Sequence, residues 1–238
     1  NGATGTLNIG GTSTIDTLTA NTGGNAVNYT DTGTQTVIGT TYYHLTLSNT
    51  GNKTLGGNSV VGGDLTVGSG ATFTVGNRDI AVTGATSVSG ILTHSSATGT
   101  KTYTGTVTIN NGGTWNETAG AAISFGGNLQ NDGTYTADAG VHTFTGSSKT
   151  LSGVNAISIP SVAINGTYQN NTTLTVSTAL TGSGSLTQGA NATLNIGASA
   201  ANLTLSTLAA TASPNTVNYN GAAQTVKAVN YHHLTLSG

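Results

Sequence analysis

The stretch Val61-Gly62-Gly63-Asp64-Leu65-Thr66-Val67, followed by Phe73-Thr74-Val75, sets the pattern of this 238-residue chain. In Leu65-Thr66-Val67 and in Phe73-Thr74-Val75, two apolar residues flank one polar residue. Glycines lie between these two units. Side chains two positions apart share one face of a strand, so Leu65 and Val67 point one way and Thr66 the other. The stretch therefore predicts short, half-buried strands divided by turns.

The same apolar-polar-apolar unit returns along the whole chain, with turn signals between its copies. The apolar pairs are Leu45/Leu47, Leu65/Val67, Phe73/Val75, Ile80/Val82, Val107/Ile109, Ile123/Phe125, Ile157/Ile159, Leu174/Val176 and Leu194/Ile196. The turn signals are Gly56-Gly57, Gly62-Gly63, Asn111-Gly112-Gly113, Asn131-Asp132-Gly133 and Asn165-Gly166. The strands are therefore expected to be short and closely spaced along the chain.

The composition excludes several protein classes. The chain has 36 Gly, only five Lys or Arg and only seven Asp or Glu, so its formal net charge is −2. Val, Ile and Thr abound, which argues against the highly charged, β-branch-poor make-up of a disordered chain. Strong helix formers are scarce, and Gly interrupts most stretches of about ten residues, so essentially no α-helix is expected. The few basic residues argue against binding to nucleic acid, which needs clustered Lys and Arg.

The sequence also bears on location. Its longest apolar runs are far too short to span a membrane, so no membrane span is predicted. The absence of Cys excludes disulfides and thiolate chemistry and agrees with a bacterial or archaeal surface protein. An extracellular or cell-surface location is therefore expected.

Residues 1–47 resemble residues 190–237. Thr6-Leu7-Asn8-Ile9-Gly10 returns as Thr193-Leu194-Asn195-Ile196-Gly197, and Val27-Asn28-Tyr29 returns as Val217-Asn218-Tyr219. Gln35-Thr36-Val37 matches Gln224-Thr225-Val226, and Tyr43–Ser48 matches His232–Ser237. The shift is 187 to 190 residues throughout. Residues 1–238 are therefore expected to form a single continuous domain that is a segment of a longer repeat array.

Two all-β architectures fit short strands divided by turns, an antiparallel β-sandwich and an elongated β-solenoid. Internal similarity favours the solenoid, because each coil buries its apolar face only by stacking on similar neighbours. With about 20 to 25 residues per coil and strands about 4.8 Å apart, the chain predicts roughly ten coils and a rod about 50 Å long.

Two passages carry a resemblance to a known class of proteins. The segments Tyr43–Leu55, which begins Tyr-His-Leu-Thr-Leu-Ser, and Val61–Val67 resemble the bacterial β-strand-repeat surface proteins, which are similar to filamentous haemagglutinin-like β-solenoid adhesins. The resemblance implies a secreted β-solenoid used as a stalk, adhesin or matrix fibre. It implies no catalytic residue and no particular ligand.

Aromatic and imidazole side chains form the candidate binding or stacking patch. Its residues are Tyr42, Tyr43, His44, Trp115, Tyr231, His232 and His233. A simple role is stacking on neighbouring coils, and a His pair without nearby carboxylates falls short of a metal-ligand set. No metal, cofactor or catalytic residue is therefore assigned.

The acidic residues and the threonines are candidates for further sites. The acids Asp16, Asp31, Asp64, Asp79, Glu117, Asp132 and Asp138 form no evident catalytic pair, and turn chemistry accounts for several of them. Thr-x-Thr runs occur at 30–36, 72–74, 102–108, 134–136 and 143–145. A flat face of aligned Thr could order water and bind ice, but β-propensity alone also enriches Thr in strands. Alignment of these residues in columns is what would distinguish the two explanations.

These features lead to a non-enzymatic, structural expectation. The chain is expected to be a component of an extracellular or cell-surface filament, with a second copy of itself as its partner through end-to-end stacking of coils. An adhesin stalk or a carbohydrate-binding surface protein that contacts surface glycans is the alternative. An ice-binding or polysaccharide-acting β-helix is the third hypothesis.

Overall fold

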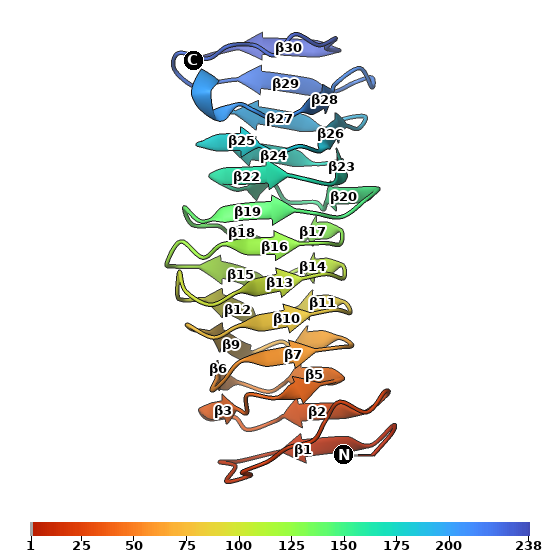
Figure 1. Ribbon diagram of the computed structural model, residues 1–238, viewed down its shortest axis with the longest axis vertical. Coiled ribbons are helices and arrows are strands. Elements are labelled where there is room, and N and C mark those ends of the chain that lie inside the picture. The colour runs from red at the N-terminus through yellow and green to blue at the C-terminus, as the bar shows by residue number, and fades with distance from the viewer. Residues whose placement is uncertain (1) are drawn as a thin grey trace.

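The computed structural model describes residues 2–238 and is a β-solenoid (Figure 1). Neighbouring strands in its sheets are parallel and in register. The alternative of antiparallel sandwich repeats is therefore wrong. The one helix among the described residues is the short 3₁₀ turn η1 at Ala200–Asn202, so the expectation of essentially no α-helix is confirmed.

Four parallel sheets run along the solenoid. The long sheet contains β1 (Thr6–Ile9), β2 (Ala26–Tyr29), β5 (His44–Leu47), β8 (Leu65–Val67), β11 (Thr86–Val88), β14 (Val107–Ile109), β17 (Leu129–Asn131), β20 (Lys149–Ser152), β23 (Thr167–Asn170), β26 (Ser185–Gln188) and β28 (Thr207–Ala209). The eight-stranded sheet contains β4 (Thr41–Tyr42), β7 (Ser59–Val61), β10 (Ile80–Val82), β13 (Lys101–Tyr103), β16 (Ile123–Phe125), β19 (Val141–Phe144), β22 (Ser161–Ile164) and β25 (Ala179–Thr181). The six-stranded sheet contains β3 (Gln35–Val37), β6 (Gly51–Leu55), β9 (Ala71–Val75), β12 (Ile91–His94), β15 (Thr114–Glu117) and β18 (Thr134–Thr136). The five-stranded sheet contains β21 (Ile157–Ser158), β24 (Thr173–Val176), β27 (Thr193–Ile196), β29 (Thr216–Tyr219) and β30 (His233–Leu236).

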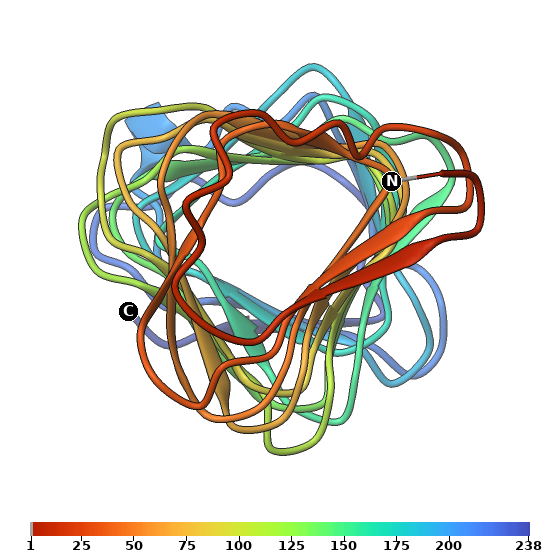
Figure 2. The same cartoon turned by 90° about the horizontal axis from the view of Figure 1, so that it is seen from below.

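These sheets form three sides around a common axis, as the end view in Figure 2 shows. The long sheet is the first side, and the eight-stranded sheet is the third. The second side is formed by the six-stranded sheet and then by the five-stranded sheet, whose strand β21 contacts β18. Through most of its length the chain visits the first, second and third sides in that order before the next coil begins.

The coils are at the short end of the range of about 20 to 25 residues that the sequence predicted. Paired residues are 20 positions apart between Leu45 and Leu65, 23 apart between Thr193 and Thr216, and 17 apart between Thr216 and His233. The long sheet alone has 11 strands, so the chain makes more coils than the roughly ten expected. The difference arises because many turns at the corners take only two or three residues.

The interior is filled by columns of like residues. Leu45 pairs with Leu65 and Leu47 with Val67, and all four side chains are fully buried. Such columns merge into a single cluster of buried apolar residues that runs along the axis. This arrangement follows from the period-2 pattern, because parallel in-register pairing places each apolar pair directly over the pair of the preceding coil.

One corner of the solenoid requires glycine for reasons of space. A Cβ at Gly84 would collide with the backbone of Gly63, one at Gly105 with the carbonyl of Gly84, and one at Gly127 with the carbonyl of Gly105. These glycines do not need a left-handed φ. Instead, they let the backbones of successive coils approach closely where the chain turns between the third and first sides.

The substitution Gly105→Ala is expected to destabilise the fold by about 1–3 kcal/mol, because the added methyl meets backbone that cannot move without shifting the stack. Gly76→Ala is the matched control, since a Cβ there meets nothing within 4 Å. Urea unfolding followed by circular dichroism measures both. Equal midpoints for the two variants would contradict the steric role of this corner.

Candidate functional site

Tyr42 belongs to the core and not to a surface patch. Its ring is fully buried in β4. Its hydroxyl lies 3.2 Å from Tyr29 Oη and donates to the Ile38 carbonyl over 2.6 Å, while the Ile38 N–H donates to Tyr29 Oη over 3.0 Å. Burial raises the pKa of Tyr42, so the phenol stays neutral. Its assignment to an exposed stacking patch is corrected: the ring is inaccessible to a ligand.

The repeated segment near the C-terminus builds the same arrangement. Tyr219 Oη lies 2.9 Å from Tyr231 Oη. Tyr231 donates to the Lys227 carbonyl over 2.7 Å, and the Lys227 N–H donates to Tyr219 Oη over 3.1 Å. Tyr231 is half-buried, and burial raises its pKa as well. Tyr231 therefore has the same structural task as Tyr42.

A glutamine accompanies each tyrosine pair. Gln35 Nε2 donates to the carbonyls of Ile9 and Gly11, at 2.9 and 3.0 Å. In the repeated segment Gln224 Nε2 donates to the carbonyls of Ile196 and Ala198, at 2.7 and 2.8 Å. Each glutamine thus clamps its coil to the preceding one. The sequence repeat is therefore a repeat of specific hydrogen bonds as well as of apolar pattern.

The remaining members of the patch lie nearer the surface. His44 is partly exposed, and its Nδ1 accepts a hydrogen bond of 2.9 Å from the Asp64 N–H. The Asp64 carboxylate lies 3.5 Å from the same nitrogen, so a carboxylate does accompany this histidine. The Tyr43 ring packs edge-on against His44 with centroids 4.5 Å apart.

At the other end, His232 and His233 are exposed, with ring centroids 4.2 Å apart. Among the described residues, no group of three or more His, Cys, Asp or Glu side chains is placed to hold a metal ion. The histidines at the two ends therefore belong to separate surface positions on the rod.

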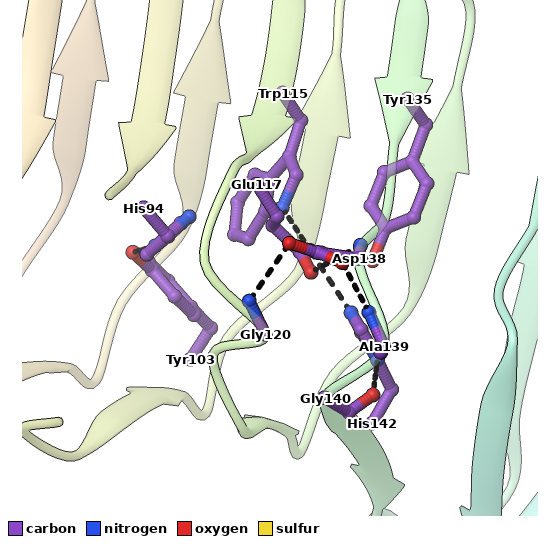
Figure 3. A network of polar contacts seen from close by, with 10 residues as sticks. All are labelled: His94, Tyr103, Trp115, Glu117, Gly120, Tyr135, Asp138, Ala139, Gly140 and His142. Atoms are coloured by element: carbon purple, nitrogen blue, oxygen red, sulfur yellow. Dashed lines mark hydrogen bonds and ion pairs between the residues drawn. The ribbon is translucent and has the colours of Figure 1, made fainter. Parts of the chain in front are cut away.

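Trp115 also lies in the core, so its place in an exposed patch is corrected. It is fully buried in β15 and belongs to a polar network shown in Figure 3. Glu117 Oε1 accepts hydrogen bonds from Trp115 Nε1 at 2.8 Å and from Tyr135 Oη at 3.3 Å. Glu117 Oε2 accepts from the Asp138 N–H at 3.2 Å. His142 Nε2 lies 2.9 Å from Glu117 Oε1, and both side chains have zero exposure.

Both ring nitrogens of His142 have hydrogen-bond partners. His142 Nδ1 faces the Gly140 carbonyl at 2.9 Å, while Nε2 faces the Glu117 carboxyl group. A carbonyl only accepts, so Nδ1 carries a proton. The Nε2 contact then needs a second shared proton, either on the imidazole or on the carboxyl group. Burial and the nearby Glu117 charge raise the pKa of Tyr135 well above its ordinary value, which keeps Tyr135 a neutral donor.

A second buried histidine borders this network. His94 Nε2 lies 2.7 Å from Tyr103 Oη, whereas His94 Nδ1 has no hydrogen-bond partner. Burial, with smaller contributions from Lys101 and His142, lowers the pKa of His94 to about 3. His94 is therefore neutral in the folded protein at ordinary pH. The network is enclosed, so its geometry suits packing within the rod better than chemistry on a substrate.

The sequence interpretation missed this network, although a signal was present. Glu117 follows Trp115 by two positions, and His142 precedes Phe144 by two. Alternation therefore assigns both side chains to the interior. Their 25-residue separation gave no hint that they meet, because β15 and β19 lie on different sides of the solenoid.

Two lysines are also buried, and their ammonium groups hold loops together through hydrogen bonds to backbone carbonyls. Lys53 Nζ donates to the carbonyls of Asp31 and Thr50, at 2.8 and 2.6 Å. Lys101 Nζ donates to the Gly99 carbonyl at 2.9 Å. Burial lowers the pKa of both lysines. Backbone carbonyls surround these cations, so they do not form an exposed cationic site.

The acidic residues show no catalytic pair at a shallow surface hollow of the solenoid. This hollow has a volume of about 410 Å³ on the eight-stranded sheet, and Asp79 is the one carboxylate that lines it. Asp79 Oδ1 accepts a hydrogen bond of 2.6 Å from the Thr100 N–H. An acid beside a turn is expected to accept such a hydrogen bond from a nearby backbone N–H, here one of the next coil.

The outward side of the six-stranded sheet carries aligned threonines. We call this surface the threonine face. One column is Thr36, Thr54, Thr74, Thr93, Asn116 and Thr136, and the other is Asn52, Thr72, Ile91, Thr114 and Thr134. It contains no charged side chain. Within the described part of the chain, no hydrogen bond to protein involves these threonine hydroxyls.

Only part of the threonine pattern contributes to this face. Thr36, Thr72/Thr74 and Thr134/Thr136 lie in its columns. In contrast, Thr102 and Thr143 belong to the eight-stranded sheet, and Thr108 belongs to the long sheet. The other sides also satisfy polar groups locally, as where Asn110 Nδ2 donates to Ser87 and Ser89 hydroxyls at 2.9 Å each.

The buried neutral His94 gives folding a pH dependence. Its pKa is about 3 when folded and about 6.5 when unfolded, so the unfolded chain binds the extra proton between these values. The free energy of unfolding is therefore expected to fall as pH drops from about 6.5 toward 3. In His94→Gln the slope in this window becomes shallower by up to about 1.4 kcal/mol per pH unit.

Urea unfolding over a pH series measures this effect. His232→Gln is the control, because His232 is exposed and should leave the profile unchanged. The same pH slope in His94→Gln and in the unsubstituted protein would show that His94 is not the titrating group.

Within residues 2–238, no helix has the length and apolar character that crossing a membrane requires. Comparisons of the chain with protein-family models, with curated proteins and with solved structures each find no match.

Proposed function

We propose that the chain is a structural component of an extracellular or cell-surface filament whose coils stack end to end. The observation that carries this proposal is the repetition of one hydrogen-bonded unit at both ends of the rod. The Gln35 clamp and the Tyr29–Tyr42 pair recur as the Gln224 clamp and the Tyr219–Tyr231 pair. Such a unit continues a stack wherever a similar coil follows it.

The stacking surfaces and the charge support this proposal. Leu234 and Leu236 of β30 are 43% and 66% exposed, whereas the equivalent Leu45 and Leu47 are fully buried between neighbouring strands. A further coil of the same kind on β30 would bury Leu234 and Leu236 as Leu45 and Leu47 are buried. The formal net charge of −2 gives little long-range repulsion between rods. The resemblance of Tyr43–Leu55 and Val61–Val67 to bacterial surface repeats agrees with this role.

The adhesin alternative keeps fewer contact residues. Tyr42 and Trp115 are buried, so a glycan-binding patch would depend on the remaining members, which are Tyr43, His44, Tyr231, His232 and His233. A stalk that carries a separate binding tip needs no such patch. The filament proposal is preferred because it uses the repeated ends directly.

Assembly of the purified 238-residue chain tests the proposal. Sedimentation and electron microscopy are expected to find rods of constant width that lengthen with protein concentration and have an axial spacing of about 4.8 Å. The double variant Leu234→Lys/Leu236→Lys should shorten the rods, because charges on a stacking edge oppose pairing. Val154→Lys is the control, since Val154 is 84% exposed away from both terminal strands. A monodisperse monomer at high concentration would contradict the proposal.

The threonine face favours ice binding as a second candidate function. Its columns repeat about every 4.8 Å along the axis and about every 6.6 Å across it, because strands and alternate residues have these spacings. Free hydroxyls and methyl groups on a charge-free, regular surface suit the ordered, uncharged lattice of ice better than a charged ligand. This alignment is the criterion that separates a lattice-binding face from β-propensity alone.

Ice-crystal shaping and inhibition of ice recrystallisation test this second function. The unsubstituted protein is expected to shape ice, and Thr74→Tyr/Thr93→Tyr is expected to lose the effect because the rings break the surface in its middle. Thr66→Tyr on the long sheet is the control of equal bulk. Ice growth that is unaffected by the unsubstituted protein would remove the candidate.

A further inference from the structure

Three Asn-Gly pairs lie within residues 2–238, and the dipeptide alone does not distinguish them. An asparagine before glycine is prone to lose its side-chain amide as ammonia, because a following residue without a Cβ leaves its backbone nitrogen accessible to the asparagine side chain. The reaction needs a backbone nitrogen that can move toward this side chain and give up its proton. The three pairs are Asn111-Gly112, Asn165-Gly166 and Asn220-Gly221.

Two of the pairs have a glycine nitrogen that already donates a hydrogen bond and a backbone without free space. The Gly166 N–H donates to the Phe144 carbonyl over 2.9 Å, and a Cβ at Gly166 would collide with the Gly146 carbonyl. The Gly221 N–H donates to Gln224 Oε1 over 2.8 Å, and a Cβ there would also collide with backbone of the preceding coil. Neither nitrogen can turn toward the asparagine side chain while its coil stays folded.

The third pair lies in a corner loop that is longer than the same corner of the neighbouring coils. Four residues, 110–113, connect β14 to β15, whereas two residues connect β11 to β12 and two connect β17 to β18. Asn111 and Gly112 are both exposed, and a Cβ at Gly112 would meet nothing within 4 Å. Within the described residues, neither the Gly112 N–H nor the Asn111 side chain makes a hydrogen bond to protein. The middle of this loop therefore lacks the contacts that hold the other two pairs.

The two ends of this loop are fixed to the preceding coil. The Asn110 N–H donates to the Val88 carbonyl over 2.9 Å, and the Thr114 N–H donates to the Gly90 carbonyl over 2.8 Å. A change of the backbone in the middle of the loop thus lies between two anchored residues. The strands β14 and β15 are expected to keep their places when it occurs.

We propose that Asn111 is a site of spontaneous deamidation in the folded protein. The Gly112 nitrogen gives up its proton and forms a bond to Asn111 Cγ, and the Cγ–Nδ2 bond breaks. The departing nitrogen takes up that proton and leaves as ammonia. One water then opens the resulting cyclic imide. Cleavage of its bond to Cγ leaves aspartate, whereas cleavage of its bond to the Asn111 backbone carbonyl carbon leaves isoaspartate, whose main chain continues through Cβ and Cγ.

The modification changes the charge of the rod. Each conversion replaces a neutral amide by a carboxylate, which adds one negative charge to a chain whose formal net charge is −2. The reaction needs only water, and it is irreversible because the ammonia diffuses away. The corner between the first and second sides at this coil therefore becomes acidic as the protein ages.

Incubation in mildly alkaline buffer made with heavy-oxygen water tests the proposal, because the opening of the imide places labelled oxygen in the product. Trypsin then separates the sites, since peptide 102–149 contains Asn111 and peptide 150–227 contains the other two asparagines. Mass spectrometry of the folded chain is expected to find labelled acid at Asn111 about tenfold or more faster than at Asn165 or Asn220, which react only when their coils open. In guanidinium chloride all three sites are expected to convert at similar rates.

The variant Asn111→Gln is the matched control. Its longer side chain must close a larger ring, so peptide 102–149 is expected to stay unlabelled at this position. Similar conversion of all three sites in the folded chain would overturn the proposal, as would an intact Asn111 amide after the unfolded sample has reacted. Circular dichroism of the folded sample is expected to stay constant during conversion. Loss of β-sheet signal in step with the labelling would show that the reaction follows unfolding, which also overturns the proposal.

Discussion

The parallel, in-register ladder is the constraint on which the rest of this molecule depends. It sets each residue directly over its counterpart, about 4.8 Å along the axis. Apolar residues therefore stack in columns such as Leu45 on Leu65. The same proximity imposes glycine at the corner of Gly84 and Gly105, where only hydrogen fits between successive backbones. Regularity in the sequence is thus a steric requirement of the stack.

Polar residues inside this ladder need partners from neighbouring coils. Asn170 and Gln188 pair in register, and Asn170 Nδ2 donates to Gln188 Oε1 over 2.8 Å. Glu117 and His142 join the second and third sides across the interior. A buried carboxyl–imidazole pair is a weak source of stability because its polar groups are costly to desolvate. Its geometry instead specifies register, since a slip of one residue in β15 would turn Glu117 outward and leave Tyr135 and His142 without their buried partner.

Alternation in the sequence predicted the short strands, and internal similarity favoured the solenoid, because each coil stacks on a similar neighbour. The same alternation did not predict which aromatic residues are accessible. An inward tyrosine and an outward one differ only in which of the two alternating positions of the strand they occupy. Tyr42 and Trp115 were assigned to a patch for their chemistry, although both lie at inward positions. The three-sided shape and the Glu117–His142 contact depend on corner geometry. The Gly, Asn and Ser residues of the short turns predict that the chain turns, but they do not predict the angle of the corner.

The length of the threonine face limits how the two candidate functions combine. The threonine face spans six strands on the second side of one copy, or about 24 Å between its outermost strands. Beyond β18 the second side continues as the five-stranded sheet. Lengthening the filament adds separate contacts without extending one continuous surface. Mechanical stacking gains with each added copy, whereas ice binding depends on a face contained within a single chain.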